Sequence, residues 1–420
     1  MAGLNNLAQS GAAKVVGTHR GSEAAPRKVT ILGSTGSVGV STLDLIEHSS
    51  AIPHEREIVV EALTANANVE LLAEQARKFN PKFVAIGNEE KLPQLRDLLG
   101  DTDIEIAGGT SGICEAAQRD ADWVMAAIVG AAGLAPTLEA AKRGAAIALA
   151  NKECLVCAGD VLMAKIRDAG GSLLPVDSEH NAMFQVFDFE RPERVTRLIL
   201  TASGGPFRTW DASKMENATP AQAVAHPNWS MGAKISVDSA TMMNKGLELI
   251  EAAHIFPVHA DNIEILVHPQ SVIHSMVEYI DGSVLAQLGT PDMRTPIAST
   301  LAWPDRMSSP SAKLDFTKNA ELTFEAPDET KFPALRLIRE VVAKGGAYPA
   351  ILNASNEIAV EAFLGERIKF GGIARVTQSV LDKADQENWP SAGLSTIEDV
   401  IEADTKGRSL AQAVVKALAS

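Results

Sequence analysis

The feature that most constrains the fold is an alternation of short apolar runs with segments of helical periodicity, beginning at residue 28. The runs KVTILG, EIVVEALTA and KFVAIGN are each followed by a longer segment of helical character. The alternation continues through ADWVMAAIVG, AAIALAN and GSLLPV. Because parallel strands are buried on both faces and need crossover connections, this pattern predicts an α/β domain with a parallel sheet over residues 28–177.

After about residue 177 the pattern changes to the strand-like segments RVTRLILTASGG, AKISVDSA, NIEILVHPQ and HSMVEYIDGSVLAQLG. The last contains Asp281-Gly282 between two alternating halves, which is typical of a hairpin. We therefore expect an α+β domain with a mixed sheet over residues 178–302. A Pro- and Ser-rich stretch predicts a connector over residues 303–332, and the remaining segments predict a helical domain over residues 333–420.

The composition is that of a globular chain, and 420 residues are enough for two or three domains. A formal charge of -15 argues against nucleic acid as a partner, because such binding relies on Lys and Arg. No apolar run is long enough to span a bilayer, so we expect no membrane partner. Residues 1–27 lack the apolar core of a secretory signal, and their polar, aperiodic character predicts a mobile tail.

The three cysteines, Cys114, Cys154 and Cys157, do not make a disulfide framework. This favours a reducing compartment, and we expect a cytoplasmic protein. Cys154 and Cys157 form a C-x-x-C pair that could act in redox chemistry or bind zinc. No second pair and no nearby His follows, so we favour the alternative of two small residues one helical turn apart.

The segment TILGSTGSVGVSTLDLI has the order strand, glycine turn, helix, with Gly33, Gly36 and Gly39 three residues apart. Such glycines let the backbone approach a pyrophosphate, whose charge then faces a helix N-terminus. The hydroxyl groups between the glycines can add hydrogen-bond donors. Because the turn lies in the first strand–helix unit, it predicts a Rossmann-like dinucleotide site; the alternative is a tight structural turn.

The end of the second strand, TANAN, bears on the choice between NAD and NADP. NAD-binding proteins usually place an Asp or Glu there to bind the ribose hydroxyls. Glu61 lies inside the strand rather than at its end. No acid repels a 2′-phosphate at this position and no basic residue holds one, so the segment favours NADP only slightly.

Two carboxylates, Asp177 and Glu179, follow the apolar run that ends at Val176. Side chains two residues apart on a strand point to the same side, so these carboxylates face one spot if the strand continues that far. Like charges that close require a proton or a positive group between them.

A third acid, Glu248, lies in SVDSATMMNKGLELIEA, where Asn244 and Glu248 share a helical face. Three carboxylates with open positions suit Mg²⁺ or Mn²⁺ rather than zinc, with Co²⁺ as a further option. The alternative is a solvated acid pair, Asp177 and Glu179, and an ordinary amphipathic helix. The hydroxyl, amide and ammonium groups of the same segment suit a phosphate monoester.

Two further loops are typical of ligand sites. LTASGGPFR ends a strand with Ser203 and two glycines, a backbone shape that binds anions. AHPNWSMGAK holds His226, Trp229 and Met231 and predicts a lid, the alternative being a connector with a buried Trp. His180 could be a base or merely a neighbour of a helix cap.

Seven segments, taken in order along the chain, resemble the motifs of the 1-deoxy-D-xylulose-5-phosphate reductoisomerase family. They are GSTGSVG, ANKE, VDSEHNA, ASGGPF, HPNWSMG, SVDSATMMNKGLE and LNASNE. The resemblance runs from residue 28 to near the end. It implies an NADPH- and divalent-metal-dependent homodimer that converts a small phosphorylated sugar, 1-deoxy-D-xylulose 5-phosphate, to 2-C-methyl-D-erythritol 4-phosphate. This reaction belongs to isoprenoid precursor biosynthesis by the non-mevalonate pathway, and residues 178–302 would carry both catalysis and dimerisation.

The resemblance also implies roles for individual residues. The implied metal ligands are Asp177, Glu179 and Glu248, which with Lys152 form the catalytic group. The implied substrate contacts are Lys152, Ser178, Glu179, Ser203, His226, Trp229, Met231, Ser239, Asn244, Lys245 and Glu248. The implied cofactor contacts are Gly33, Ser34, Thr35, Gly36, Ser37, Val38, Asn66, Asn68, Asn151, Glu153 and Gly232.

The chain departs from many members of this family at Ala67, where they carry a basic residue. How a 2′-phosphate is held is therefore open. Two rival functions also stay open from the sequence. Another NADP-linked sugar or semialdehyde dehydrogenase would need no metal, and a dinucleotide-sensing protein would need neither the acids nor the phosphate cluster.

Overall fold

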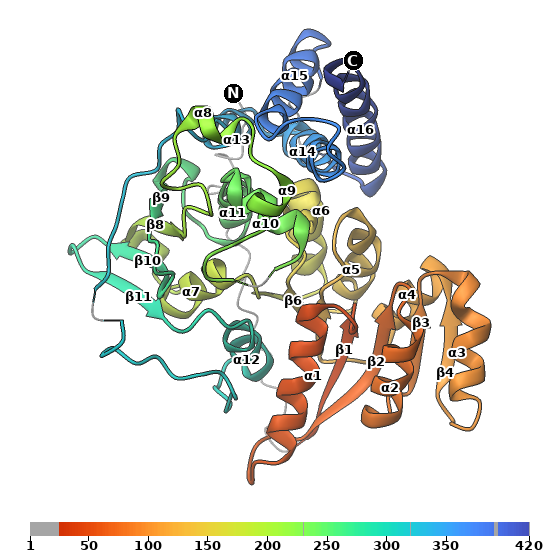
Figure 1. Cartoon of the computed structure of the whole chain (residues 1–420). Helices are drawn as coiled ribbons and strands as arrows, with labels where there is room; N and C mark the ends of the chain where they lie inside the picture. Colours follow the sequence, from red (N-terminus) through yellow and green to blue (C-terminus); the bar gives the residue numbers. More distant parts are fainter. Residues whose placement is uncertain (1–24, 230, 320, 390–393, 420) are drawn as a thin grey trace.

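The computed structural model describes residues 25–229, 231–319, 321–389 and 394–419. It contains a seven-stranded sheet, a four-stranded sheet and a group of C-terminal helices, in the order that the sequence predicts (Figure 1). Of the predicted mobile tail, residues 1–24 lie outside the described part. The first strand already begins at Arg27.

The first sheet is wholly parallel, with the strand order β4-β3-β2-β1-β5-β6-β7. The order reverses between β1 and β5, and ligands of such sheets bind at the carboxyl ends of the strands there. The strands are β1 (Arg27–Leu32), β2 (Ile58–Ala65), β3 (Phe83–Ile86), β4 (Glu105–Gly108), β5 (Trp123–Ala126), β6 (Ala146–Leu149) and β7 (Ser172–Pro175). The helices are α1 (Ser37–Ser50), α2 (Val69–Phe79), α3 (Leu92–Leu99), α4 (Gly109–Gln118), α5 (Leu134–Ala141) and α6 (Glu153–Asp168).

The second sheet is mixed, with the order β11-β10-β8-β9, and β8 and β9 are its parallel pair. The predicted hairpin is confirmed, because β10 and β11 are antiparallel and Gly282 between them has a φ of +83°. The strands are β8 (Val195–Ala202), β9 (Ile263–Val267), β10 (Ile273–Tyr279) and β11 (Val284–Leu288). The helices are α7 (Ser178–Val186), α8 (Ala212–Met215), α9 (Pro220–Ala223), α10 (Ala233–Ala240), α11 (Met243–Ile255) and α12 (Arg294–Ala302).

The C-terminal part is helical as predicted, and lies at the top of Figure 1. Its central helix contacts α6 of the first domain and α10 of the second. The described residues of 303–332 contain turns and one isolated bridge, between Val267 and Glu325. The helices are α13 (Ala334–Lys344), the central α14 (Tyr348–Leu364), α15 (Gly372–Gln386) and α16 (Ile397–Ala419). The exact domain limits stay a prediction.

One predicted strand is wrong: the segment AKISVDSA forms helix α10. Its two alternating apolar residues, Ile235 and Val237, fit a single helical turn as well as a strand, because so short a run does not fix a period. Gly232 precedes the helix in an extended conformation, and Asp238 is buried on its inner side. The helix turns the following segment toward the acids described below.

The premise that Asp177 and Glu179 share a strand face is also wrong. Strand β7 ends at Pro175, and Asp177 is the N-cap of α7. The Asp177 side chain makes no capping hydrogen bond to the helix backbone and accepts from Lys152 Nζ at 2.9 Å instead. The two carboxylates therefore converge through a helical turn rather than through strand alternation.

Candidate active site

The glycine turn after β1 is held by backbone contacts that exclude larger residues. Gly33 has a φ of +89°, and a Cβ at Gly39 would lie only 2.4 Å from the Gly33 carbonyl oxygen. The turn enters α1 through Gly36, and no side chain caps that helix. The helix N-terminus, with its partial positive charge, is therefore available to a pyrophosphate.

The side chains between these glycines are used differently. The Ser34 hydroxyl is buried and donates to Gln75 Oε1 at 2.7 Å, so it is committed to the interior rather than free for a ligand. Thr35 is half-buried, while Ser37 and Val38 line a large cavity. Of the three hydroxyl donors expected from the sequence, Thr35 and Ser37 can serve in that role.

The end of β2 is exposed and carries no Lys or Arg over residues 65–69. The Asn68 side chain caps α2 by accepting from the Leu71 N–H at 3.2 Å. Asn66 is exposed beside it, and its side chain lies close to Gly87. The polar groups at this end are thus amides rather than charges.

Three carboxylates converge next to the end of β7. Asp177 caps α7, Glu179 lies in the first turn of α7, and Glu248 comes from α11. One oxygen atom from each lies within 4.8 Å of the others. Three oxygen donors at this spacing, with space open to a cavity, are the ligand set that Mg²⁺ or Mn²⁺ prefers.

Two buried ammonium groups lie among these acids. The Lys152 Nζ is 2.9 Å from Asp177 Oδ2. The Lys245 Nζ is 2.9 Å from Glu179 Oε1 and also donates to Glu248. The two ammonium groups balance Asp177 and Glu179, and ionisation of Glu248 leaves an excess of negative charge, which a divalent cation would offset.

The three acids do not ionise alike. Burial, together with the nearby Glu179, raises the pKa of Glu248 to about 8. Burial also opposes ionisation of Asp177, but Lys152 outweighs it and holds the pKa of Asp177 well below its usual range. A bound cation would relieve the repulsion at Glu248 and, below about pH 8, would displace its proton. The residues present therefore fit a divalent metal ion.

A second polar group surrounds the loop after β8. The His226 Nδ1 accepts from the backbone N–H groups of Asn228 at 3.1 Å and Trp229 at 3.0 Å. Its Nε2 is therefore the protonated nitrogen, and it donates to Ser203 Oγ at 2.9 Å. Burial lowers the pKa of His226, in keeping with this neutral form. The Ser203 hydroxyl proton remains free to donate to an anion.

Four residues are candidates to bind the phosphate, and they divide into two pairs: Ser203 with Ser239, and Asn244 with Lys245. Ser203 and Ser239 face the cavity from β8 and α10. Asn244 accepts from Lys152 Nζ at 2.6 Å and donates to Glu248, and Lys245 contacts the acids. All four line the same cavity, so the second pair can reach either the acids or a phosphate.

One cavity of about 400 Å³ joins the glycine turn to the acids. It is large enough for a small polar ligand beside one end of a dinucleotide. Its predicted lining residues are Ser37, Val38, Lys152, Asp177, Ser178, Glu179, Ser203, His226, Trp229, Met231, Gly232, Ser239, Asn244, Lys245 and Glu248. The sequence did not indicate Ser41, Thr201, Ser271, His274, Asp292 or Met293, which also line it.

Eight residues expected to contact a cofactor lie outside that lining: Gly33, Ser34, Thr35, Gly36, Asn66, Asn68, Asn151 and Glu153. Asn151 donates to the Gly130 carbonyl at 2.9 Å and accepts from the Cys154 N–H at 2.8 Å, so it holds the loop after β5. Glu153 begins α6 and lies 3.6 Å from Lys234.

His180 and Glu251 lie behind the three acids. The His180 ring is fully buried, and its Nε2 donates to the Glu248 carbonyl at 2.8 Å. His180 therefore supports α11 and does not line the cavity. Glu251 is buried one turn after Glu248, and burial raises its pKa well above the usual range. Sequence reasoning missed Glu251, although its three-residue spacing from Glu248 on a helix was a signal.

Three family models match most of the chain. The model described as 1-deoxy-D-xylulose 5-phosphate reductoisomerase matches residues 29–159. The model described as the C-terminal domain of that enzyme matches residues 173–256, and the model described as the DXP reductoisomerase C-terminal domain matches residues 288–410. The chain belongs to the 1-deoxy-D-xylulose 5-phosphate reductoisomerase family. The resemblance inferred from the sequence motifs is confirmed.

Named relatives in this family are similar over nearly the full chain. The reductoisomerase of Rhodospirillum centenum is 59% identical over 93% of this chain and 95% of its own. That of Caulobacter vibrioides is 55% identical over 94% of this chain and 98% of its own. The solved reductoisomerase of Zymomonas mobilis in complex with NADPH is 52% identical, with a TM-score of 0.87 over 94% of this chain and all of that one. A DOX-P reductoisomerase solved with NADPH, fosmidomycin and magnesium is 43% identical, with a TM-score of 0.88 over 93% of this chain and 99% of that one.

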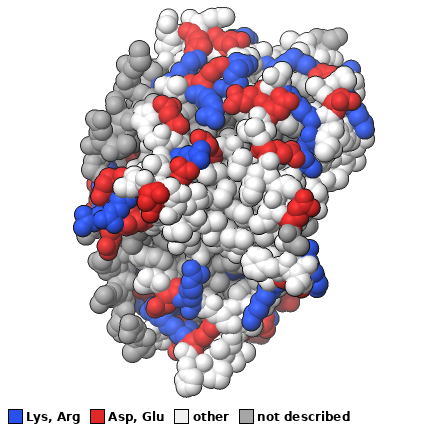
Figure 2. Space-filling model, turned by 90° about the vertical axis from the view of Figure 1, so that its left-hand side faces the viewer, with Lys and Arg blue, Asp and Glu red and all other residues white. Residues whose placement is uncertain are grey.

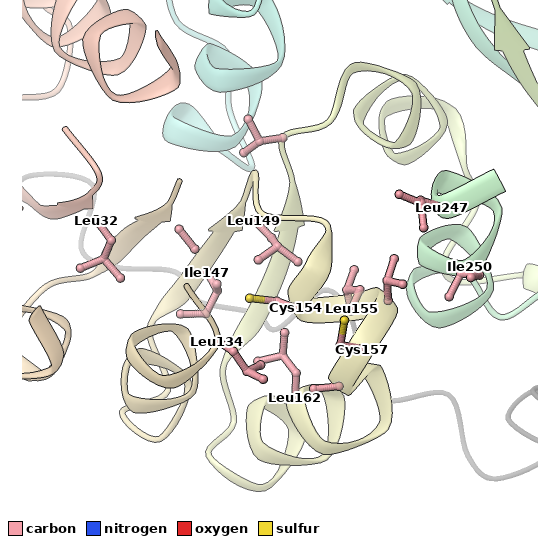
Figure 3. Close-up of a cluster of buried hydrophobic side chains, with 14 of the residues drawn as sticks. Leu32, Leu134, Ile147, Leu149, Cys154, Leu155, Cys157, Leu162, Leu247 and Ile250 are labelled. Atoms are coloured by element: carbon pink, nitrogen blue, oxygen red, sulfur yellow. The ribbon is translucent and has the colours of Figure 1, made fainter. Parts of the chain in front are cut away.

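The C-x-x-C pair of this reductoisomerase family member belongs to the hydrophobic core. Cys154 and Cys157 are buried, and burial raises the pKa of both thiols. Figure 3 shows their sulfur atoms among leucine and isoleucine side chains, including Leu134, Leu155 and Leu162. Thiols that remain protonated in such surroundings are poor ligands and poor nucleophiles, so the structural interpretation holds.

No helix among the described residues is long and apolar enough to cross a bilayer.

Proposed function

We propose that the chain catalyses the NADPH- and divalent-metal-dependent isomerisation and reduction of 1-deoxy-D-xylulose 5-phosphate to 2-C-methyl-D-erythritol 4-phosphate. This places it in the non-mevalonate pathway of isoprenoid precursor biosynthesis. The observation that carries the proposal is one cavity lined both by Ser37 and Val38, at the start of the helix after the glycine turn, and by the three carboxylates. A relative of the same name is 59% identical over 93% of the chain.

The residues proposed to hold the metal ion are Asp177, Glu179 and Glu248. The bound ion, Mg²⁺ or Mn²⁺ with Co²⁺ as a further option, supplies Lewis-acid polarisation of substrate oxygens. In the structure, Lys245 contacts Glu179 and Glu248. A cation held by these carboxylates would compete with the Lys245 ammonium group and could free it. That ammonium group is then available to the substrate phosphate.

The glycine turn is proposed to receive the NADPH pyrophosphate through residues Gly33–Val38 and the N-terminus of α1. NADPH supplies the hydride for reduction. Its nicotinamide end would lie toward the acids, since Ser37 and Val38 share a cavity with Lys152 and Glu248. The amides at the end of β2, Asn66 and Asn68, are proposed to meet the adenosine end. Asn151, Glu153 and Gly232 complete the proposed cofactor contacts.

The substrate is proposed to lie with its phosphate toward Ser203 and Ser239, joined by Asn244 and Lys245. His226 fixes the orientation of Ser203, which keeps one hydroxyl proton free for that phosphate. Lys152 and Ser178 are proposed to bind the oxygens at the other end of the sugar, beside the acids. Both line the cavity next to Asp177.

The loop after α9 is proposed to close over the substrate. Trp229 and Met231 line the cavity. The ring centroids of Trp229 and His274 are 6.1 Å apart. The loop is tethered by Asn228, which donates to the Pro269 carbonyl at 2.7 Å and to Ser271 Oγ at 3.0 Å, and by the bond between His226 and Ser203. Closure would remove water and strengthen electrostatic interactions within the site.

A homodimer is also proposed, formed through the mixed sheet. Among the described residues, strand β11 is an edge of this sheet, and its Val284 and Leu285 are exposed. Figure 2, which views this side, shows a broad area without charged side chains. A second copy of the chain would cover such an edge and face. A cytoplasmic location is proposed on the three free thiols.

The direct test is an assay with 1-deoxy-D-xylulose 5-phosphate, NADPH and Mg²⁺ or Mn²⁺, with NADPH oxidation followed by absorbance. We expect oxidation only when all three are present, and loss of oxidation on chelation that is restored by added metal. Oxidation that persists in excess chelator would favour a dehydrogenase without a metal. Absence of oxidation under every condition, with NADPH still bound, would favour a dinucleotide-sensing protein.

A further inference from the structure

Glu251 is a fourth carboxylate beside the proposed metal site, and it is buried. It lies on α11, with 3% of its surface exposed. Its Oε2 is 4.0 Å from the Lys152 Nζ and 3.9 Å from the His180 Nδ1. Neither Glu251 Oε2 nor His180 Nδ1 has a hydrogen-bond partner among the described residues. Burying a carboxylate is costly unless charged or polar groups compensate it, so its presence calls for a role.

The geometry separates Glu251 from the three proposed ligands. Oxygen atoms of Asp177, Glu179 and Glu248 form one group within 4.8 Å, and Asp177, His180 and Glu251 form another. The two groups share only Asp177. Glu251 thus lies near Lys152 and His180, in the group of possible ligands that contains neither Glu179 nor Glu248.

We propose that Glu251 is a positioning residue that holds the Lys152 ammonium in place while the metal ligands are engaged. This inference rests on the proposed function. Lys152 now contacts Asp177 at 2.9 Å and lies 3.9 Å from Glu248. Both of these carboxylates are committed once a metal ion is bound. Glu251 is then the remaining carboxylate among the described neighbours of Lys152, and it fixes the ammonium that is to meet the substrate.

Glu251 acts on the same centre by a second contact, through His180. The His180 Nε2 donates to the backbone carbonyl of Glu248, so the position of the ring bears on the proposed ligand. Its Nδ1 faces Glu251. The same Nδ1 also lies 3.9 Å from Asp177 Oδ2, so Glu251 and Asp177 together border this edge of the ring.

The test compares Glu251→Gln with Glu248→Gln, because both replace one carboxyl group on the same helix with an amide of nearly the same volume. For Glu251→Gln we expect Mn²⁺ affinity, measured by calorimetry on the substrate-free protein, to stay within about threefold of wild type. We expect kcat to fall by about 10- to 100-fold. For Glu248→Gln we expect the Mn²⁺ affinity itself to be lost.

A double-mutant cycle distinguishes positioning from general structural support. If Glu251 acts through Lys152, then adding Glu251→Gln to Lys152→Met should lower kcat/KM no further. If Glu251→Gln lowers kcat/KM by the same factor in the Lys152→Met protein as in the wild type, the proposal is overturned. It is also overturned by loss of Mn²⁺ affinity in Glu251→Gln, which would make Glu251 a ligand, or by activity within twofold of wild type.

If Glu251→Gln does not fold, the same cycle is run with Glu251→Asp, which keeps the charge and shortens its reach. Melting temperatures measured beside the kinetics show whether each variant is folded. A failure of wild-type turnover would count against the proposed function. A normal wild type with an unaffected Glu251→Gln would count against this inference alone.

Discussion

The two ends of the cavity, the glycine turn and the group of acids, are suited to charged ligands by different physical means. At the glycine turn, a Cβ on Gly39 would lie 2.4 Å from a backbone oxygen, so the shape is set by backbone packing and no side-chain charge is needed. At the acid end, Asp177, Glu179 and Glu248 are held by Lys152 and Lys245, and the pKa of Glu248 is raised to about 8. The first end keeps its shape without its ligand, whereas the second gains a net negative charge when Glu248 ionises, and a cation would offset that charge.

This difference predicts that the two ends can be disabled separately. Substitutions at the acid end should remove chemistry and leave NADPH binding intact. Substitutions at the glycine turn should remove NADPH binding and leave the metal site intact. The experiments below are ordered from the largest expected effect to the smallest.

Glu248→Gln should abolish turnover. The change removes one of three carboxylates at a fully buried position, so the cation loses a ligand and a charge. NADPH affinity, measured by fluorescence, should stay near the wild-type value because the glycine turn is untouched. Near-normal activity at low Mg²⁺ concentration would refute the metal assignment, and parallel loss of NADPH affinity would refute the separation of the two ends.

Gly39→Ala should disrupt the glycine turn. Its Cβ would also lie 2.5 Å from Ser34 Cα, so the backbone must move, at a cost of about 1–3 kcal/mol in the free energy of unfolding. We expect weak NADPH binding with Mn²⁺ binding unchanged. Gly36→Ala is the matched control, because its Cβ would meet nothing closer than 3.5 Å and stability should be unchanged. Equal destabilisation of both variants would show that crowding is not the cause.

Trp229→Ala should lower kcat/KM by up to about 100-fold with a small effect on folding. The side chain lines the cavity and is half-buried, so its removal opens the proposed lid. A structural Trp would instead cost about 3–5 kcal/mol of stability through a cavity. Melting temperature is measured beside kcat/KM. A large fall in melting temperature with little specific loss of activity would discard the lid.

The preference for NADPH over NADH should be real but small. The end of β2 offers the amides of Asn66 and Asn68 and no ammonium or guanidinium group, and one of those amides already caps α2. Charge-assisted contacts to phosphate contribute about 1.5–3 kcal/mol each, and this chain lacks one here. Comparing kcat/KM for the two cofactors, with Ala67→Lys as the matched variant, checks this. An unchanged ratio in Ala67→Lys would place the 2′-phosphate elsewhere.

The parallel sheet and the glycine turn were predictable because each is encoded in contiguous residues. Short apolar runs such as KVTILG and AAIALAN mark buried strands, and the glycine spacing marks the turn. Helix α10 was missed because Ile235 and Val237 alone fit either period. The convergence of the three acids followed from their residue types and the family motifs, but the reason first given for it, a continuing strand, was wrong.

The remaining parts of the site depend on packing that sequence spacing does not encode. His180 and Glu251 meet only because α7 and α11 pack together, with the His180 ring bonded to the Glu248 carbonyl. Likewise, Ser34 is turned inward by Gln75, a partner 41 residues away. Such pairs are fixed by tertiary contacts, so motif reading identifies the residues but not which of them face a ligand.

The central claim is that one cavity joins skeletal rearrangement to reduction, and the carbon skeleton of the product tests it most directly. The protein is incubated with ¹³C-labelled 1-deoxy-D-xylulose 5-phosphate, NADPH and Mg²⁺, and the product is identified by NMR. We predict the branched 2-C-methyl-D-erythritol 4-phosphate, formed only when metal is present. An unbranched deoxypentitol phosphate, formed with or without metal, would show simple ketone reduction and contradict the account.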